Sequence, residues 1–333
     1  MKAYIGVDVG SLTTKLVALD EYGDAFFTKY IRNRGGPIEA VQQGFRELEK
    51  EQKEDMNICG VGTTGSGRHL ASIMAGADII KNEITAHAVA ASHVSPEART
   101  VIDIGGQDSK IIHLKDGVAV GFNMNTVCAA GTGSFLDHQS ERLGIPIEEF
   151  GEYALQSNNA VRISGRCGVF AESDLIHKQQ MGYKREDLIA GLCMALARNY
   201  VTNVARSKKL EPVVLFQGGV AANRGIKRSL ESLLDLELLV PENFKVMGAY
   251  GAALLARREK QGAEEQSNYR GAHMISNFDC YPNSFICEDC SNSCEINELY
   301  INDELVSRWG SRCAKWEDLH YRSPNSNEEK TLF

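Results

Sequence analysis

Two cysteines of this chain precede glycine-rich segments, a pattern suited to metal binding or electron transfer. Cys128 lies within NTVCAAGTG at 125–133, and Cys167 lies within SGRCGVFAE at 164–172. Helices are expected to follow, at about 131–143 and 168–181. The positive end of a helix dipole lowers the pKa of a nearby thiol and favours the thiolate, the form that binds metal. Cys128 and Cys167 are therefore candidate metal ligands.

Three other glycine-rich loops have the composition of a nucleotide site. DVGSLTTK at 8–15 and DIGGQDSK at 103–110 each place an aspartate at a strand end, followed by glycine and hydroxyl side chains. Backbone N–H groups in such turns can bind phosphate, and carboxylates can hold Mg²⁺. Asp8, Asp103 and Gln107 are predicted to position Mg²⁺ and water for ATP hydrolysis.

The third loop, GGVAAN at 218–223, allows the close backbone approach that an adenosine pocket requires. Any one of the three loops could be an ordinary glycine turn, but their order along the chain favours a nucleotide site. The glycine-rich segment 62–68 follows no clear strand-to-helix pattern, so a structural loop is favoured there. The candidate nucleotide-binding residues are Gly10, Ser11, Thr13, Thr14, Lys15, Gly105, Gly106, Ser109, Gly218, Gly219, Ala221 and Asn223.

The elements that must position these loops form a repeat. An apolar strand, an aspartate, a glycine turn and a second strand occur first as a hairpin within residues 1–30. They recur at 100–114, with Asp103 following Asp8 by 95 positions. This duplication predicts two α/β lobes with a cleft between them. Further helices are expected at 37–52, 185–207 and 247–260, and a strand at 213–216.

The expected division is lobe I at 1–98, completed by helix 247–260, and lobe II with the candidate cysteines at 99–246. A polar linker at 261–272, a cysteine-rich metal-binding module at 273–321 and a flexible tail at 322–333 are expected to follow.

The composition argues against a nucleic-acid-binding protein and against a membrane-spanning protein. The 333 residues carry a net charge of −8 with no basic stripe, which argues against nucleic acid as a partner. No apolar run approaches the ~20 residues of a membrane span. The N-terminus leads directly into a strand, so no signal peptide is expected and a cytoplasmic protein is predicted. In that reducing compartment the nine cysteines are expected to bind metal or carry electrons rather than form disulfides.

The order of the motifs resembles the superfamily of actin, Hsp70 and sugar kinases, whose lobes have a duplicated actin-like (ribonuclease H-like) fold. Within it, the chain is similar to the activators of 2-hydroxyacyl-CoA dehydratases, related to the ATPase subunits of benzoyl-CoA reductase (the BadF/BadG/BcrA/BcrD type). The likeness covers about residues 3–258. The motifs that carry it are GVDVGS at 6–11, EITAHA at 83–88, DIGGQDSK at 103–110, CAAGTG at 128–133 and CGVFAE at 167–172.

The resemblance implies a homodimer that holds one bridging [4Fe–4S] cluster and uses ATP hydrolysis to pass a low-potential electron to a partner enzyme. It implies Cys128 and Cys167 as cluster ligands, and the loops around Asp8, Asp103 and Gly218 as the ATP site. The implied acceptor is an iron–sulfur 2-hydroxyacyl-CoA dehydratase or a related reductase. The implied donor is ferredoxin or flavodoxin.

The residues themselves are compatible with a shared cluster. A [4Fe–4S] cluster takes four thiolates, and residues 1–260 contain four cysteines. Cys59 lies in a strand-like stretch and Cys193 on an apolar helix, so both are interpreted as small buried side chains. Two ligands remain per chain, and a two-fold axis would supply the other two. The alternative is a pair of buried or regulatory thiols.

The C-terminal segment carries five more candidate metal ligands. Cys280, Cys287, Cys290, Cys294 and Cys313 are separated by 6, 2, 3 and 18 residues, with an expected hairpin at 299–306. Such spacings fit structural zinc and also an iron–sulfur cluster. An iron–sulfur cluster would serve as a second electron relay, and zinc would stabilise a module too small for a core of its own. The shorter activators lack this extension, which resembles a cysteine-rich stretch of longer fused relatives.

Three functions remain open at this point. An ATP-dependent electron-transfer activator accounts for both cysteine segments. A small-molecule kinase of the same fold would transfer phosphate to a substrate without needing Cys128. A nucleotide-switched redox sensor or scaffold would bind ATP without reducing a partner. The histidines, among them His87, are interpreted as surface or core residues because they lack metal-ligand spacing.

Overall fold

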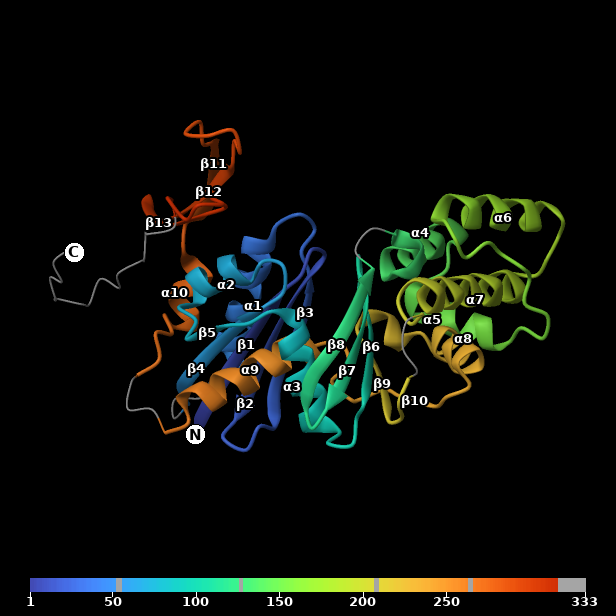
Figure 1. The fold of residues 1–333 in the computed structure, drawn as a ribbon, viewed down its shortest axis with the longest axis horizontal. Helices are drawn as coiled ribbons and strands as arrows, with labels where there is room; N and C mark the ends of the chain where they lie inside the picture. Colours follow the sequence, from blue (N-terminus) through green and yellow to red (C-terminus); the bar gives the residue numbers. More distant parts are fainter. Residues whose placement is uncertain (52–55, 126–127, 207–209, 263–265, 317–333) are drawn as a thin grey trace, which may run out of the picture.

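The computed structural model describes residues 1–51, 56–125, 128–206, 210–262 and 266–316. Two five-stranded sheets form the centres of two lobes, with helices packed around them (Figure 1). The strands of lobe I are β1 (Lys2–Val9), β2 (Thr13–Asp20), β3 (Ala25–Arg32), β4 (Asn57–Thr64) and β5 (Ile79–Ile80). Those of lobe II are β6 (Thr100–Ile104), β7 (Ser109–Lys115), β8 (Val118–Asn125), β9 (Val214–Gln217) and β10 (Leu238–Leu239).

The two sheets have the same topology. Lobe I has the order β3-β2-β1-β4-β5 and lobe II the order β8-β7-β6-β9-β10. In each, the central strand pairs antiparallel with the next strand in the chain and parallel with the fourth. This repetition confirms the predicted duplicated α/β fold. The predicted hairpin within residues 1–30 was incomplete, because β3 adds a third antiparallel strand.

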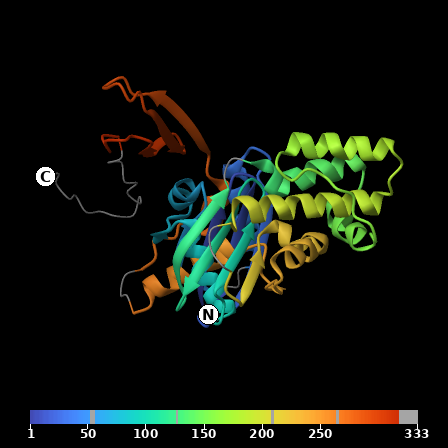
Figure 2. The same ribbon diagram turned by 45° about the vertical axis from the view of Figure 1, so that its right-hand side comes forward.

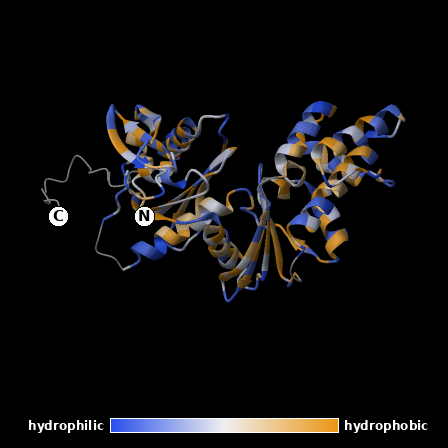
Figure 3. Ribbon diagram, turned by 45° about the horizontal axis from the view of Figure 1, so that its top comes forward, coloured by the Kyte–Doolittle hydropathy of each residue, from blue (hydrophilic) through white to orange (hydrophobic). Residues whose placement is uncertain are grey.

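Helices cover the sheets and separate the lobes. With lobe I lie α1 (Pro37–Glu51), α2 (Arg68–Ala75), α3 (Glu83–Val94) and α9 (Met247–Lys260). With lobe II lie α4 (Gly133–Leu143), α5 (Ile147–Leu155), α6 (Gly168–Gln180), α7 (Arg185–Asn203) and α8 (Arg224–Leu234), preceded by short 3₁₀ turns at Ala129–Gly131 and Gly219–Ala222. Apolar residues follow the strands and parts of the helices around them (Figure 3).

Helix α9 returns from lobe II and packs on the sheet of lobe I. A Cβ atom at Gly6 of β1 would lie 1.8 Å from the carbonyl oxygen of Ala249, and one at Gly62 of β4 would lie 2.2 Å from that of Ala252. Only glycine fits at these strand positions. The glycines of β1 and β4 therefore let α9 approach the sheet backbone and complete lobe I.

The C-terminal residues form a small antiparallel sheet that packs on lobe I. Helix α10 (Ala272–Asn277) leads into β11 (Cys280–Ile286), β12 (Glu295–Ile301) and β13 (Glu304–Trp309). Leu299, Ile301 and Val306 belong to one apolar core with Phe45 and Leu48 of α1. Figure 2 shows this sheet and the helices of lobe II on opposite sides of the molecule.

The segment expected as a linker, 261–272, contacts lobe I over part of its length. The Ser267 hydroxyl donates a 2.6 Å hydrogen bond to Asp78, and the Arg270 N–H donates to the carbonyl of Ala75. The expected tail at 322–333 lies outside the described residues. Within the described ranges, no helix combines the length and apolarity needed to cross a membrane.

Candidate functional site

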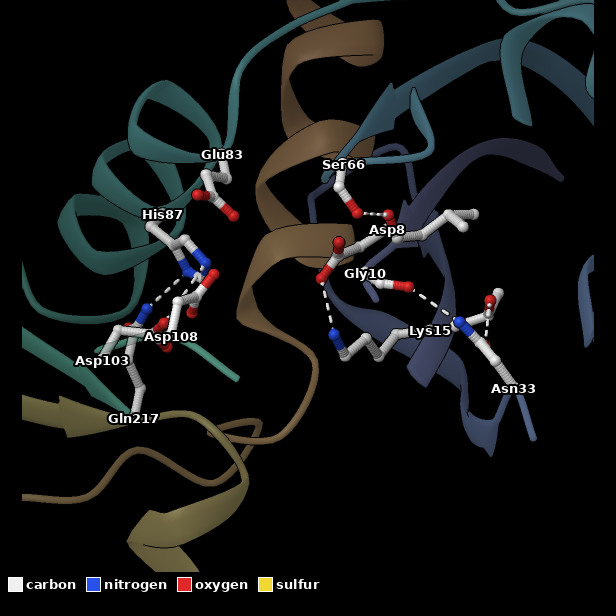
Figure 4. A network of polar contacts seen from close by, with 12 residues as sticks. Asp8, Gly10, Lys15, Asn33, Ser66, Glu83, His87, Asp103, Asp108 and Gln217 are labelled. Carbon is white, nitrogen blue, oxygen red and sulfur yellow. Dashed lines mark hydrogen bonds and ion pairs between the residues drawn. The ribbon is translucent and has the colours of Figure 1, made fainter. Parts of the chain in front are cut away.

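A cavity lies between the lobes, where the loops after β1, β6 and β9 meet the start of α9 (Figure 4). Its lining includes predicted residues from all three glycine-rich loops: Asp8, Gly10, Ser11, Thr13, Lys15, Asp103, Gly105, Gly106, Gln107, Gly218 and Gly219. The topology explains this convergence, because each loop leaves the sheet at the edge that faces the other lobe. The structure thus brings segments 200 residues apart to one place.

Asp8 is held in a fixed position at the end of β1. Its carboxylate lies 3.1 Å from the Lys15 ammonium on β2. Burial disfavours the charge on Lys15, but the charge and hydrogen bond of Asp8 more than offset this and raise the lysine pKa. A Cβ atom at Gly65 would lie 2.5 Å, and one at Gly248 2.6 Å, from the Asp8 carboxylate. Two glycines therefore make the space that Asp8 occupies.

Asp103, which occupies the position in lobe II that Asp8 occupies in lobe I, belongs to a larger group of charged side chains. Lys110 is 2% exposed and lies 3.2 Å from Asp103, 3.0 Å from Asp108 and 3.3 Å from Glu83. Burial alone would raise the pKa of Asp103, but the adjacent His87 and Lys110 lower it to about 2. Asp103 is consequently ionised at neutral pH.

His87 is a buried core histidine, as one of its two interpretations expects, and it also lines this cavity. Its side chain is buried on α3, with Nδ1 2.6 Å from the Gln217 amide nitrogen and Nε2 3.9 Å from Asp103. Glu83, one turn earlier on α3, also faces the cavity. The available signal was the segment EITAHA at 83–88, which places a carboxylate and an imidazole four positions apart on one helix face.

Four predicted nucleotide-binding residues do not line the cavity. Thr14 is buried and donates a hydrogen bond to Asn33, and Ser109 lies within β7 with no exposure. Ala221 is buried in the core of lobe II. Asn223 accepts a hydrogen bond from the N–H of Ile226 and caps α8. The positions near the cavity that sequence analysis missed are Leu12, Tyr30, Glu83, His87, Asp108, Lys110, Phe244, Lys245, Met247 and Gly248.

The donor set of the cavity fits Mg²⁺ with a nucleotide. The carboxylates of Asp8, Asp103, Asp108 and Glu83 supply the oxygen ligands that Mg²⁺ prefers, directly or through water. Lys15 and Lys110 can offset phosphate charge. The carboxylate groups come from both lobes, so an ion between them would join the lobes.

A second cavity of about 490 Å³ adjoins the first and shares Gly10, Ser11, Glu83 and Asp108 with it. Its lining includes Ser66 and Arg68 from the glycine-rich segment 62–68. That segment does join a strand to a helix, since it ends β4 and leads into α2. The structural-loop interpretation was based on the lack of a strand-to-helix pattern, and that pattern is present.

The segments that contain the two candidate cluster cysteines are neighbours in lobe II. Cys128 precedes the 3₁₀ turn before α4, and Cys167 is the N-cap residue of α6. Both thiols are half-buried and neither caps its helix by a hydrogen bond. The Asn199 amide of α7 lies 3.8 Å from the Cys128 sulfur and donates a 2.6 Å hydrogen bond to the carbonyl of Gly165.

The segment after Cys128 is hydrogen-bonded directly to the glycine loop after β6, which lines the cavity. The N–H of Gly133 donates to the carbonyl of Gly105, and the N–H of Ser134 donates to that of Gly106, each at 2.8 Å. The middle of α4 contacts lobe I, because the Asp137 carboxylate lies 3.3 Å from the Arg32 guanidinium of β3. A movement of the nucleotide loop must therefore displace the start of α4.

The remaining cysteines are dispersed. Cys193 is fully buried, as expected, and Cys59 is half-buried on β4. Of the C-terminal five, Cys280 begins β11, whereas Cys287, Cys290, Cys294 and Cys313 lie at the far end of the same sheet. As the side chains stand, no three His, Cys, Asp or Glu residues surround a common point in the described part of the chain.

Fold and site together define an ATPase of the actin-like class, with two duplicated lobes around a nucleotide cavity. The chain belongs to the BadF/BadG/BcrA/BcrD ATPase family, whose model matches residues 5–256. The (R)-2-hydroxyglutaryl-CoA dehydratase activating ATPase of Acidaminococcus fermentans is 36% identical over 259 residues, which are 77% of this chain and 97% of that protein. The activator of lactoyl-CoA dehydratase from Anaerotignum propionicum is also 36% identical, over 77% of this chain and 98% of its own length.

A solved structure supports the same relationship. The activator of 2-hydroxyisocaproyl-CoA dehydratase from Clostridium difficile, with bound ADPNP, superimposes with a TM-score of 0.71 at 34% identity. The match covers 78% of this chain and 96% of that one. Because the family model ends at residue 256, the C-terminal sheet and its cysteines lie beyond it.

Proposed function

We propose that this protein is an ATP-dependent activator that transfers low-potential electrons to a partner iron–sulfur enzyme. The partner class is a 2-hydroxyacyl-CoA dehydratase or a related reductase, since the named relatives activate such dehydratases. ATP and Mg²⁺ would bind between the lobes, with Asp8 and Asp103 holding the ion and Gln107 orienting water. Ferredoxin or flavodoxin would be the electron donor.

In this proposal Cys128 and Cys167 of two identical chains hold one [4Fe–4S] cluster. Two half-buried thiols per chain, each at a helix start, are half of the four thiolates such a cluster needs. Val169 and Phe170, two and three residues after Cys167, are 69% and 64% exposed. Adjacent apolar exposure of this kind suits a surface covered by a second copy. The cluster, when bound, supplies one-electron redox chemistry.

The observation that carries the proposal is the pair of hydrogen bonds between the glycine loop after β6 and the start of α4, five residues after Cys128. Gly105 and Gly106 face the cavity, and their carbonyl oxygens accept from the first residues of α4. Closure of the lobes around a nucleotide would pull this loop and shift the Cys128 segment. The nucleotide can favour one arrangement only by binding it more tightly than the other.

The test is metal analysis of anaerobically purified protein together with activity. We expect about four iron and four sulfide ions per dimer, and ATP-dependent reduction of an added dehydratase. Cys128→Ala should lose this iron and the reduction, whereas Cys59→Ala, a half-buried cysteine of lobe I, should keep both. Iron retained at the same level in Cys128→Ala would overturn the bridging site.

A small-molecule kinase is the second candidate, favoured by the cavity that adjoins the nucleotide site. Glu83 lines both cavities and pairs with Lys110 at 3.3 Å, and in a kinase its carboxylate would be the base beside a bound hydroxyl. A kinase would show substrate-stimulated ATP consumption that is lost in Glu83→Gln and unaffected in Cys128→Ala. Activity that is lost in Cys128→Ala, with no stimulation by a small-molecule substrate, would support the activator.

A further inference from the structure

Two cysteines face each other at one end of the C-terminal sheet. Cys287 directly follows β11 and Cys294 directly precedes β12. Because Ile286 pairs with Glu295 in antiparallel register, Cys287 and Cys294 are the next opposed pair, and the Cys287 N–H donates a 2.8 Å hydrogen bond to the Cys294 carbonyl. Opposed residues of an antiparallel pair share a face, with Cβ atoms about 4.5–5.5 Å apart.

A third cysteine lies in the short connection between these two. Cys290 is three residues after Cys287, and its carbonyl accepts a hydrogen bond from the N–H of Ser293. Ser293 has a φ of 43°, so the chain turns sharply before Cys294. Cys290 therefore lies in the tight connection that joins the opposed pair.

The fourth cysteine, Cys313, lies in the segment after β13. This segment contacts the connection between Cys287 and Cys294. Arg312 contacts Asn292 at 3.5 Å, and Lys315 forms an ion pair with Asp289. The Trp316 indole N–H donates a 3.3 Å hydrogen bond to the Cys287 sulfur. Cys313 lies between these anchored positions, so its backbone is held close to the other three cysteines.

Cys280 is excluded from this group by its position. It stands at the opposite end of β11, six residues from Ile286, or about 20 Å along an extended strand. Burial raises its pKa to about 11, with Asp279 and Glu39 adding to the effect. This environment disfavours the thiolate, which is the form that binds metal.

We propose that Cys287, Cys290, Cys294 and Cys313 bind a single Zn²⁺ ion that closes the end of the C-terminal sheet. The sulfur atoms do not converge as the side chains stand, so binding requires the cysteines to turn inward about χ1. The close opposition of Cys287 and Cys294 suits one tetrahedral ion with Zn–S bonds of about 2.3 Å. An iron–sulfur cube would need ligands spread more widely around it.

The surroundings suit an anionic four-thiolate site with a structural role. Arg308, which is paired with Glu298, stacks over Phe285 and Trp316, and Lys315 is paired with Asp289 of the connection, so both cations lie near the cysteines. Leu299, Ile301 and Val306 share an apolar core with lobe I. The cysteine-bearing end lies outside that core and is held by Ile296 and the Phe285–Trp316 pair, so an ion would add cross-links to a small apolar group.

Its location also favours structure over electron relay. The C-terminal sheet packs on lobe I, whereas Cys128 and Cys167 precede helices of lobe II. Figures 1 and 2 agree that these elements lie on different sides of the molecule. This zinc site is independent of the proposed electron transfer, and either can fail without the other.

The test is elemental analysis of the full-length protein, purified without chelators, for zinc, iron and sulfide together. We expect about one zinc per chain. Cys290→Ser and Cys313→Ser should each lose it, while Cys280→Ser and Cys128→Ala should keep it. Proteolysis should then cleave within 287–316 at least several-fold faster in the two zinc-free variants, with nucleotide binding to the lobes unchanged.

Three outcomes would overturn the assignment. The wild-type chain could lack zinc, or Cys290→Ser and Cys313→Ser could both keep it. Alternatively, iron and sulfide in the Cys128→Ala protein that disappear with Cys290→Ser would identify an iron–sulfur cluster. The nucleotide-binding measurement separates loss of metal from general misfolding.

Discussion

The backbone N–H of Gly133, at the start of α4, donates a 2.8 Å hydrogen bond to the carbonyl oxygen of Gly105 in the nucleotide loop. Space at this contact is tight, because a Cβ atom at Gly133 would lie 3.1 Å from that oxygen. Both partners are backbone and cannot rotate away. The contact therefore links the nucleotide loop rigidly to the helix that follows Cys128.

Gly133→Ala should weaken this link without removing the nucleotide site. In iron-free wild-type protein we expect Mg-ADPNP to change the alkylation rate of Cys128 several-fold. In Gly133→Ala this ratio should fall close to one, while ADPNP affinity changes little. Gly168→Ala is the matched control, since its Cβ would meet only Phe135 at an ordinary 3.6 Å. An undiminished nucleotide effect in Gly133→Ala would show that another path connects the two sites.

Gly248→Ala should impair nucleotide binding through Asp8. The added Cβ would lie 2.6 Å from the Asp8 carboxylate and force it away from its position in the cavity. Because alanine is about 1 kcal/mol better than glycine within a helix, global unfolding is not the expected result. We expect Mg-ADPNP affinity, measured by calorimetry, to fall about tenfold, equivalent to about 1.4 kcal/mol.

Gly44→Ala on α1 is the control for Gly248→Ala. Its Cβ would meet Ile31 and Leu16 at 3.5 Å or more, which is ordinary contact. Binding should remain at the wild-type level there. Equal affinities in the two variants would mean that Asp8 adjusts without consequence.

The low pKa of Asp103 predicts a defined acid sensitivity. Its pKa is about 2 in the folded protein, against about 3.9 in an unfolded chain. The ionised carboxylate thus contributes stability that is complete above pH about 4 and is lost as the pH falls towards 2. The contribution is about 2–3 kcal/mol.

The measurement is the free energy of unfolding of wild type and Asp103→Asn from pH 5 down to 2. The advantage of wild type should shrink across the lower part of that interval. A difference that stays constant with pH would show that Asp103 has an ordinary pKa.

Cys193 should be chemically inert in the folded protein. It is fully buried, and burial raises its pKa to about 12. Iodoacetamide at pH 8 should label the half-buried Cys128 and Cys167 of metal-free protein at least tenfold faster. Peptide mapping after timed labelling measures each rate. Comparable labelling of Cys193 would contradict its burial.

The stability consequence of Cys193 has the opposite sign to that of Asp103. A raised pKa means that the neutral thiol is favoured by the fold, so this contribution is complete below the unfolded pKa of about 8.5. It is lost as the pH rises from there towards 12.

The sequence by itself determined the duplicated fold and the three glycine-rich loops that line the cavity between the lobes. Alternating apolar strands, each followed by aspartate and glycine, define backbone shapes that depend mainly on local sequence. Asp8 and Asp103 therefore stand where their repeat predicts, at matching strand ends. The helix starts after Cys128 and Cys167 were likewise predictable from glycine and apolar spacing.

Only the tertiary structure decided which side chains share the cavity. Glu83 and His87 lie on α3, and only packing of that helix between the lobes turns them towards Lys110 and Asp103. Conversely, Thr14 and Asn223 have polar side chains that could bind a nucleotide, but both point away from the cavity. Thr14 alternates to the other face of its strand, and Asn223 caps α8. Long-range packing, rather than local residue type, sets these orientations.

The C-terminal cysteines illustrate the same division. Their spacing indicated metal binding but could not separate Cys280 from the other four. The register of β11 against β12 does so, because it places Cys287 opposite Cys294 and leaves Cys280 at the far end. Register depends on cross-strand pairing and on contacts with lobe I, so it becomes visible only when the chain is folded.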